Sequence, residues 1–491
     1  MEKCVLYDDM AGIGLKKASE LGATYADIRF VDDDRLAVLV RNGKPEDISS
    51  TSGRGFGVRV IVNGAWGFSG SRNMTENEVR DAVDKAVKVA RGSALRKKKD
   101  VRLAQVKTVD GKYSTTVQID PFEHPLEDIL DHLLAAEGTV KSQSKYIRTS
   151  SAQYEARREK KFIATSEGSR IQQTIVFCGG GVSGTAVRDG LVQVRSYPSF
   201  LQSSFSTAGY EYVKSLDLVG NAEWVGKEAE ALLDAKPCPT EIKTSLILDD
   251  GQLGLQLHEV CGHPTELDRV LGTEIDMAGD SFMTPEKLGK LKYGSKHVNI
   301  VADATRPGEM GTFGYDDEGV PPKKVDLIKE GVFSGYQSSR ETAAEIGLPE
   351  SSGNMRAMTA LNVPLVRMSN INLLPGDWKK DEIIEDTKEG ILMRSTKMWS
   401  IDRMRLNFQF GTEAGWRIEN GELKEMVRDP TYTGVTYEFW GSVDAVAKDG
   451  WYPWGTTSCG KGRPSQSMYV GHGCSSARFR NVRVGIIRSG P

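Results

Sequence analysis

The sequence predicts an α+β protein with two domains. The N-terminal α+β domain is expected to contain a twisted antiparallel sheet, and the C-terminal domain is expected to be β-rich and to carry a metal-binding helix. Three observations favour this fold class. Helical and alternating patterns both occur in the first half of the chain. The 52 glycines punctuate many short β-type segments, which is typical of hairpins and tight turns. A histidine-containing helical segment follows a short apolar strand in the second half.

The first half mixes amphipathic helices with strands that alternate in polarity. Asn63-Gly64 is a strong hairpin signal between two apolar runs. Thr75, with Glu78 three residues later, is typical of a helix start with a capping box. Asp32–Asp34 is expected to form a turn between two strands. The expected helices are 9–21, 75–90, 125–137 and 224–233, and the expected strands are 26–31, 36–40, 55–62, 65–68, 162–165, 171–176 and 191–195.

Lys236–Pro239 has two prolines in four residues and is interpreted as a stiff linker. We therefore predict domains at residues 1–235 and 236–491. In the second domain the expected strands are 244–249, 299–302, 324–328 and 332–336.

The segment Leu257–Pro264 contains two of the six histidines of the chain and a glutamate. Neutral imidazole is a common zinc ligand, and a carboxylate beside such a pair is the usual base for water activation. His258 and His263 are five residues apart, so on an ideal helix their rings would diverge by roughly 140°. The rings converge if the helix loosens into a π-turn or ends between them. Gly262 and Pro264 favour an end, with Gly262 as a left-handed cap.

A catalytic zinc site needs a third protein ligand. Cys261 is a local candidate, whereas Cys459 and Cys474 lie far downstream in glycine-rich segments. Spacing does not choose among the three, and each could instead be a small buried residue.

Composition excludes several classes of partner. The formal net charge is −3, which gives no electrostatic reason to expect nucleic acid or an anionic membrane. No apolar stretch approaches the ~20 residues that a membrane span needs, and the N-terminus lacks the apolar segment of a signal peptide. We expect a cytoplasmic location, where the six cysteines would be free or metal-bound.

Several segments, in the same order along nearly the whole chain, resemble the TldD/PmbA family of metallopeptidases on its TldD side. They are Gly22–Arg29, Ser52–Val60, His258–His263 with Glu266 and Asp268, Asp316–Gly319, Leu327–Tyr336, Pro364–Asn370, Leu374–Gly376 and Cys459–Lys461.

The resemblance implies that His258, His263 and Cys459 bind one Zn²⁺ per chain and that Glu259 is the catalytic base. It implies a peptidase that hydrolyses unfolded peptides or small proteins. We expect low sequence specificity, because a peptide that binds to an exposed strand near the site is held by its backbone groups. It also implies a homodimer, or a heterodimer with an inactive PmbA/TldE-like subunit. The alternative is a catalytically silent binding or assembly subunit that keeps the motif without using it.

Other polar residues near these motifs can be interpreted in more than one way. Glu266 or Asp268 could orient a ligand imidazole or be ordinary solvated acids. Asp316–Glu318 could be a paired-carboxylate site, but consecutive acids beside glycine and proline are more often a turn. His472 could lie near the site, but the sequence assigns it no role.

Overall fold

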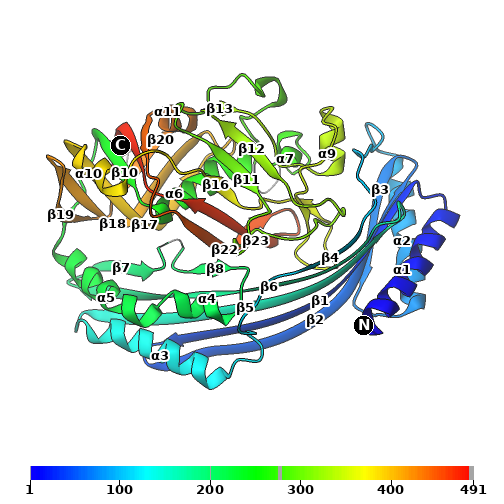
Figure 1. Ribbon diagram of the computed structural model, residues 1–491, viewed down its shortest axis with the longest axis horizontal. Coiled ribbons are helices and arrows are strands. Elements are labelled where there is room, and N and C mark those ends of the chain that lie inside the picture. The colour runs from blue at the N-terminus through cyan, green and yellow to red at the C-terminus, as the bar shows by residue number, and fades with distance from the viewer. Residues whose placement is uncertain (1, 200, 275–278, 486–491) are drawn as a thin grey trace.

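A long, curved sheet formed by the first half of the chain runs along the molecule, and the second half lies on its concave side (Figure 1). The computed structural model describes residues 2–199, 201–274 and 279–485. The strand order is β3-β2-β1-β5-β6-β4, and β7 and β8 also pair with β6. All of these pairs are antiparallel except β4 with β6, so the predicted antiparallel sheet is confirmed. Its strands are β1 (Tyr25–Arg41), β2 (Lys44–Val62), β3 (Ala65–Ser71), β4 (Asp110–Ser114), β5 (Ile147–Thr165), β6 (Arg170–Arg188), β7 (Leu191–Tyr197) and β8 (Ser204–Ser206).

The turn predicted at Asp32–Asp34 is wrong, because β1 continues through these residues between β2 and β5. The acids are accommodated by basic neighbours. Asp33 forms ion pairs with Arg157 on β5 and with Arg35 on its own strand. Cross-strand pairs of opposite charge stabilise a sheet, so a run of acids does not break the strand here.

Helices cover the sheet at its two ends (Figure 1). The predicted hairpin and cap are confirmed: Asn63 and Gly64 both have positive φ, at 52° and 69°, and the Thr75 side chain accepts a hydrogen bond from the Glu78 amide. The helices of this half are α1 (Glu2–Glu20), α2 (Glu76–Ala94), α3 (Leu126–Ser142), α4 (Tyr210–Ser215) and α5 (Leu218–Asp234).

The second half is built around a closed ring of strands. β10 pairs with β17 and β24, β24 pairs with β20, β20 pairs with β18, and β18 returns to β17. The ring and its extensions comprise β9 (Lys236–Pro237), β10 (Ile242–Leu248), β17 (Glu389–Ile401), β18 (Asn407–Glu419), β19 (Glu422–Arg428), β20 (Thr431–Val435), β21 (Val443–Val446) and β24 (Ala477–Val484). A barrel of this kind has no free edge in the ring.

Smaller sheets and short helices complete this half, and its apolar side chains form one large core with those of the ring. A four-stranded sheet contains β11 (Ile300–Asp303), β12 (Lys324–Lys329), β13 (Val332–Phe333) and β16 (Ile371–Leu373). Two hairpins are β14 (Met355–Arg356) with β15 (Leu365–Val366), and β22 (Tyr452–Lys461) with β23 (Gln466–Cys474). The α-helices are α6 (Asp250–Gln256), α7 (Leu267–Val270), α9 (Arg340–Glu345), α10 (Lys380–Glu385) and α11 (Thr436–Gly441), and η3 (Pro285–Lys287) is a 3₁₀ turn.

The acidic run Asp316–Glu318 joins the two halves and does not form a paired-carboxylate cleft. Asp317 pairs with Arg29 on β1 and lies 2.7 Å from Lys161 Nζ on β5. Glu318 accepts a hydrogen bond from the Arg340 amide. All three acids are buried, so the interpretation as a structural turn holds.

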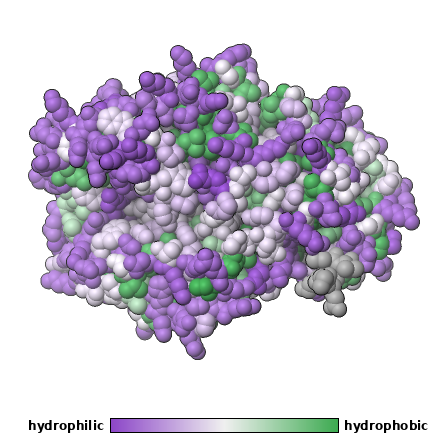
Figure 2. All heavy atoms as spheres, in the orientation of Figure 1, coloured by the Kyte–Doolittle hydropathy of each residue, from purple (hydrophilic) through white to green (hydrophobic). Residues whose placement is uncertain are grey.

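No helix in the described ranges is long and apolar enough to cross a bilayer. The face shown in Figure 2 is mostly hydrophilic, with apolar residues in separate patches.

Candidate metal centre

The two motif histidines converge because the helix widens between them. Asp249 caps α6 by accepting a hydrogen bond from the Gln252 amide. The helix then continues as a π-helix at Leu257–Gly262, followed by a 3₁₀ turn at His263–Thr265. The His263 amide donates a hydrogen bond to the His258 carbonyl, five residues earlier. This wider turn brings side chains that are five residues apart onto the same face of the helix.

The helix therefore does not end between the histidines, and the predicted left-handed cap at Gly262 is wrong. Gly262 has a right-handed φ of −59°. A glycine is required there for space, because a Cβ would lie 2.1 Å from Met368 Sδ.

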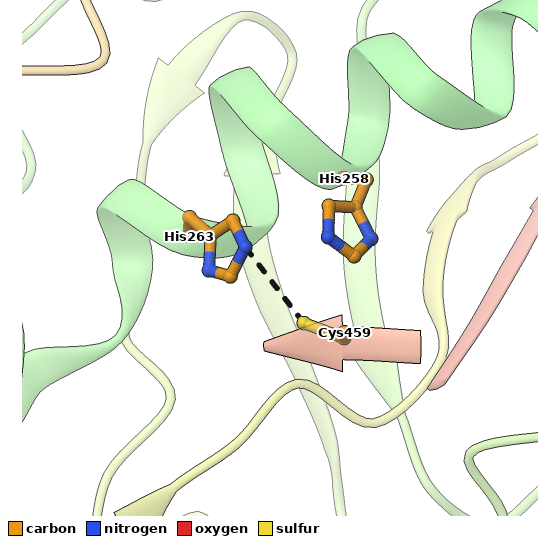
Figure 3. Close-up of side chains that lie close together, drawn as sticks. All are labelled: His258, His263 and Cys459. Atoms are coloured by element: carbon orange, nitrogen blue, oxygen red, sulfur yellow. Dashed lines mark hydrogen bonds between the residues drawn. The ribbon is translucent and has the colours of Figure 1, made fainter. Parts of the chain in front are cut away.

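Cys459 reaches the two imidazoles from β22 (Figure 3). The ligand atoms of His258, His263 and Cys459 all lie within 4.8 Å of one another, and Cys459 Sγ is 3.8 Å from His263 Nε2. All three side chains are buried, with exposures of 3–6%. Donor atoms around a tetrahedral zinc lie roughly 3.3–3.8 Å apart. Small side-chain rotations would therefore bring these three donor atoms to the separations that zinc requires. The two nitrogens and the sulfur match zinc in number and type.

The other two cysteine candidates lie elsewhere. Cys261 is in the apolar core, where burial raises the pKa of its thiol. Cys474 Sγ lies 3.1 Å from the Asp250 carbonyl, and burial raises its pKa as well. The five cysteines with described side chains are free; Cys4 lies outside the described side chains.

The surroundings of Cys459 favour its thiolate. Burial acts to raise the pKa of this thiol, but the charge of Arg367 and the contact with His263 outweigh it, so the pKa lies below the ordinary value. The thiolate is the form that binds metal.

His263 is oriented by a carboxylate. Its Nδ1 lies 2.9 Å from Glu266 Oε2, which leaves Nε2 facing Cys459. Burial would raise the pKa of Glu266, but Lys461 and His263 hold it well below the ordinary value. Asp268 pairs with the same lysine, and its Oδ1 lies 2.7 Å from Lys461 Nζ.

His258 is oriented by another histidine. Its Nδ1 lies 2.8 Å from Nε2 of His472, a fully buried residue on β23. Burial lowers the pKa of both imidazoles, and neutral imidazole is the ligand form.

Glu259 faces the same site and forms an ion pair with Arg405. Burial acts to raise the pKa of Glu259, but His258, Arg405 and His263 lower it below its ordinary value. Because burial also lowers the pKa of His258, Arg405 is the partner that keeps its charge at neutral pH.

Three family models cover most of the chain. The PmbA/TldA metallopeptidase domain 1 matches residues 26–90, the central domain matches 119–233, and the C-terminal domain matches 241–486. The chain belongs to the PmbA/TldD family of metallopeptidases.

Relatives in sequence agree with this assignment, and solved structures share the fold. A metalloprotease of Methanocaldococcus jannaschii is 35% identical over 94% of this chain and 97% of its own length. A zinc metalloprotease TldD homolog of Saccharolobus solfataricus is 25% identical over 96% of this chain and 98% of its own. The fold is similar to that of a Thermotoga maritima protein (TM-score 0.78, 17% identity, 98% of this chain and 100% of that one) and of TldE from Thermococcus kodakarensis (TM-score 0.75, 17% identity, 96% and 99%).

This metalloprotease has a cleft of about 460 Å³ that is lined by His258, His263, Glu259 and Cys459. Its other lining residues are Leu201, Leu255, Trp399, Ser400, Ile401, Arg405, Thr456, Ser458 and Gly460. Trp399 is 45% exposed, so an aromatic surface is available to a substrate beside the His/His/Cys group.

Sequence analysis alone did not find Arg405 or Arg367, and it placed His472 near the site without assigning it a role. Arg405 lies between β17 and β18, Arg367 follows β15, and His472 is on β23, and each is far from the histidine motif in the chain. His472 had one usable signal, since histidine is rare in this sequence.

Proposed function

We propose that this metallopeptidase is zinc-dependent, with His258, His263 and Cys459 as the ligands and Glu259 as the general base. The supporting observation is that three buried donor atoms lie within 4.8 Å of one another in the cleft that also contains Glu259. Two imidazoles and a thiolate suit zinc. When bound, zinc would supply the Lewis acidity that polarises a carbonyl and acidifies water.

Glu259 accepts the proton of the attacking water and passes it to the leaving amine. Its pKa below the ordinary value keeps it ionised, and therefore able to accept a proton, at neutral pH. Arg405 holds the carboxylate in place.

The proposed substrates are unfolded peptides, bound with low sequence specificity. Within the described part of the chain, β22 pairs in a sheet with β23 alone. Thr456, Ser458 and Gly460 of β22 line the cleft. A peptide added along this strand would be held by backbone hydrogen bonds, which depend little on its side chains.

We also propose a dimer, either of two identical chains or with a PmbA/TldE-like subunit, working in the cytoplasm. The similarity in fold to TldE supports the second arrangement, and the free cysteines suit a reducing compartment. Purification from the native host, followed by mass spectrometry, distinguishes the two assemblies.

The central test is Glu259→Gln, with Glu385→Gln on an exposed helix as the matched control. Glu259→Gln should keep its zinc and lose roughly 10²–10⁴-fold in peptide hydrolysis, whereas the control should match wild type. Hydrolysis by wild type should stop on chelation. Wild-type rates for Glu259→Gln would show that the base is another group. Zinc binding without chelator-sensitive hydrolysis would favour the silent assembly subunit.

A further inference from the structure

His472 lies behind the His258 imidazole. It is 0% exposed, its Nε2 is 2.8 Å from His258 Nδ1, and the two ring planes are inclined at 71°. The PmbA/TldD assignment gives this residue no role.

The contact between the two rings needs one donor and one acceptor, because Nε2 of His472 and Nδ1 of His258 face each other at 2.8 Å. In a neutral imidazole one nitrogen donates and the other accepts. When Nε2 of His258 is the atom offered to the metal, Nε2 of His472 is therefore the acceptor of this hydrogen bond.

The same argument then determines the tautomer of His258. Its Nδ1 carries the proton, and the lone pair of Nε2 remains for a metal. We propose that His472 is a positioning residue that holds His258 in the Nδ1–H tautomer with Nε2 directed toward His263 and Cys459. This inference rests on the proposed role of His258 as a zinc ligand.

The two histidine ligands are therefore oriented by partners of different charge. Glu266 is a carboxylate flanked by Arg269 and Lys461, whereas His472 is a neutral acceptor. A neutral acceptor fixes the ring without adding a negative charge beside the Cys459 thiolate. Removing a side chain that orients a metal ligand commonly changes the metal affinity by ~10–100-fold.

The test compares His472→Phe, which fills the space without an acceptor, with His472→Gln, whose amide oxygen can accept from His258. His132→Phe, in α3, is the matched control. Zinc affinity is measured by competition with a chelator. We expect His472→Phe to bind zinc ~10–100-fold more weakly, and His472→Gln and His132→Phe to stay close to wild type. Equal melting temperatures of the zinc-free proteins would show that the fold is kept.

A second readout needs neither zinc nor activity. ¹⁵N NMR of histidine-labelled, zinc-free wild type should show His258 protonated on Nδ1, and His472→Phe should lose this preference. An Nε2–H tautomer in wild type, an unchanged zinc affinity in His472→Phe, or an equal loss in the Phe and Gln variants would overturn the proposal. Failure of wild type to bind zinc would contradict the proposed function instead, while the tautomer measurement would still decide the role of His472.

Discussion

Arg405 forms an ion pair with Glu259 across 146 residues of sequence. The arginine lies in the connection between β17 and β18 and lines the same cleft as the glutamate. This contact lowers the pKa of a buried carboxyl that burial alone would raise.

Replacing Arg405 should therefore raise the pKa of Glu259. In Arg405→Ala the base becomes protonated at a higher pH, so the acid limb of the kcat profile should move to higher pH, and kcat at neutral pH should fall by about tenfold or more. Zinc content should not change. Arg403→Ala, an exposed neighbour, is the control. An unchanged pH profile in Arg405→Ala would contradict the assigned contact.

The two cysteines near the motif should differ in their effect on zinc. Cys459→Ala should lose most bound zinc because it removes one of three donors. Cys261→Ala should keep it, although removing a buried sulfur from the core should lower the melting temperature. Metal analysis of both purified proteins checks this, and zinc loss in Cys261→Ala alone would reverse the assignment.

Trp399 should affect the choice of substrate. It lines the cleft together with Ile401 and Leu201, so Trp399→Ala should lower kcat/KM about tenfold for peptides with large apolar side chains near the scissile bond, and less for small polar ones. Met398 is comparably exposed, at 41%, but is not among the cleft residues. Met398→Ala is therefore the control, and equal losses on all peptides in Trp399→Ala would argue against a side-chain contact.

Asp317 should contribute to stability in a pH-dependent way. Lys161 and Arg29 lower its pKa to about 2 against the opposing effect of burial, compared with about 3.9 in an unfolded chain. The stabilisation is thus fully present above pH ~4 and is lost as the pH falls through about 2.

Asp317→Asn leaves Arg29 buried without its carboxylate, and it should lower the free energy of unfolding by about 3–5 kcal/mol at pH 7. The difference from wild type should shrink between pH 4 and 2. Denaturant titrations at several pH values measure it, with the exposed Asp110→Asn as control. A constant difference over this range would rule out an ionised Asp317.

Local signals predicted most of the local structure. The Asn63-Gly64 hairpin and the Thr75 cap depend on residues adjacent in sequence, and both are confirmed. The histidine motif predicted a metal centre, and the structure brings its two imidazoles together with Cys459. The domain boundary near residue 235 remains a prediction.

Contacts between distant segments could not be predicted in this way. β1 continues through three aspartates because β5 supplies basic partners 124 residues later. Arg405 and His472 reach the site only after the ring and the β22–β23 hairpin have formed. Their positions depend on tertiary packing, which leaves no periodic signal in the sequence.

The widened turn at Leu257–Gly262 also limits how the site can be re-engineered. Deleting Val260 would place the two histidines four residues apart, as in the H-E-x-x-H zinc motif. It would also rotate the following residues of the helix by about 100° and draw them back about 1.5 Å. Glu266, Arg269 and the Gln337 contact to the Gly262 carbonyl would all lose register with their surroundings. The additional residue therefore cannot be deleted from this chain, and shortening the helix should abolish the metal centre.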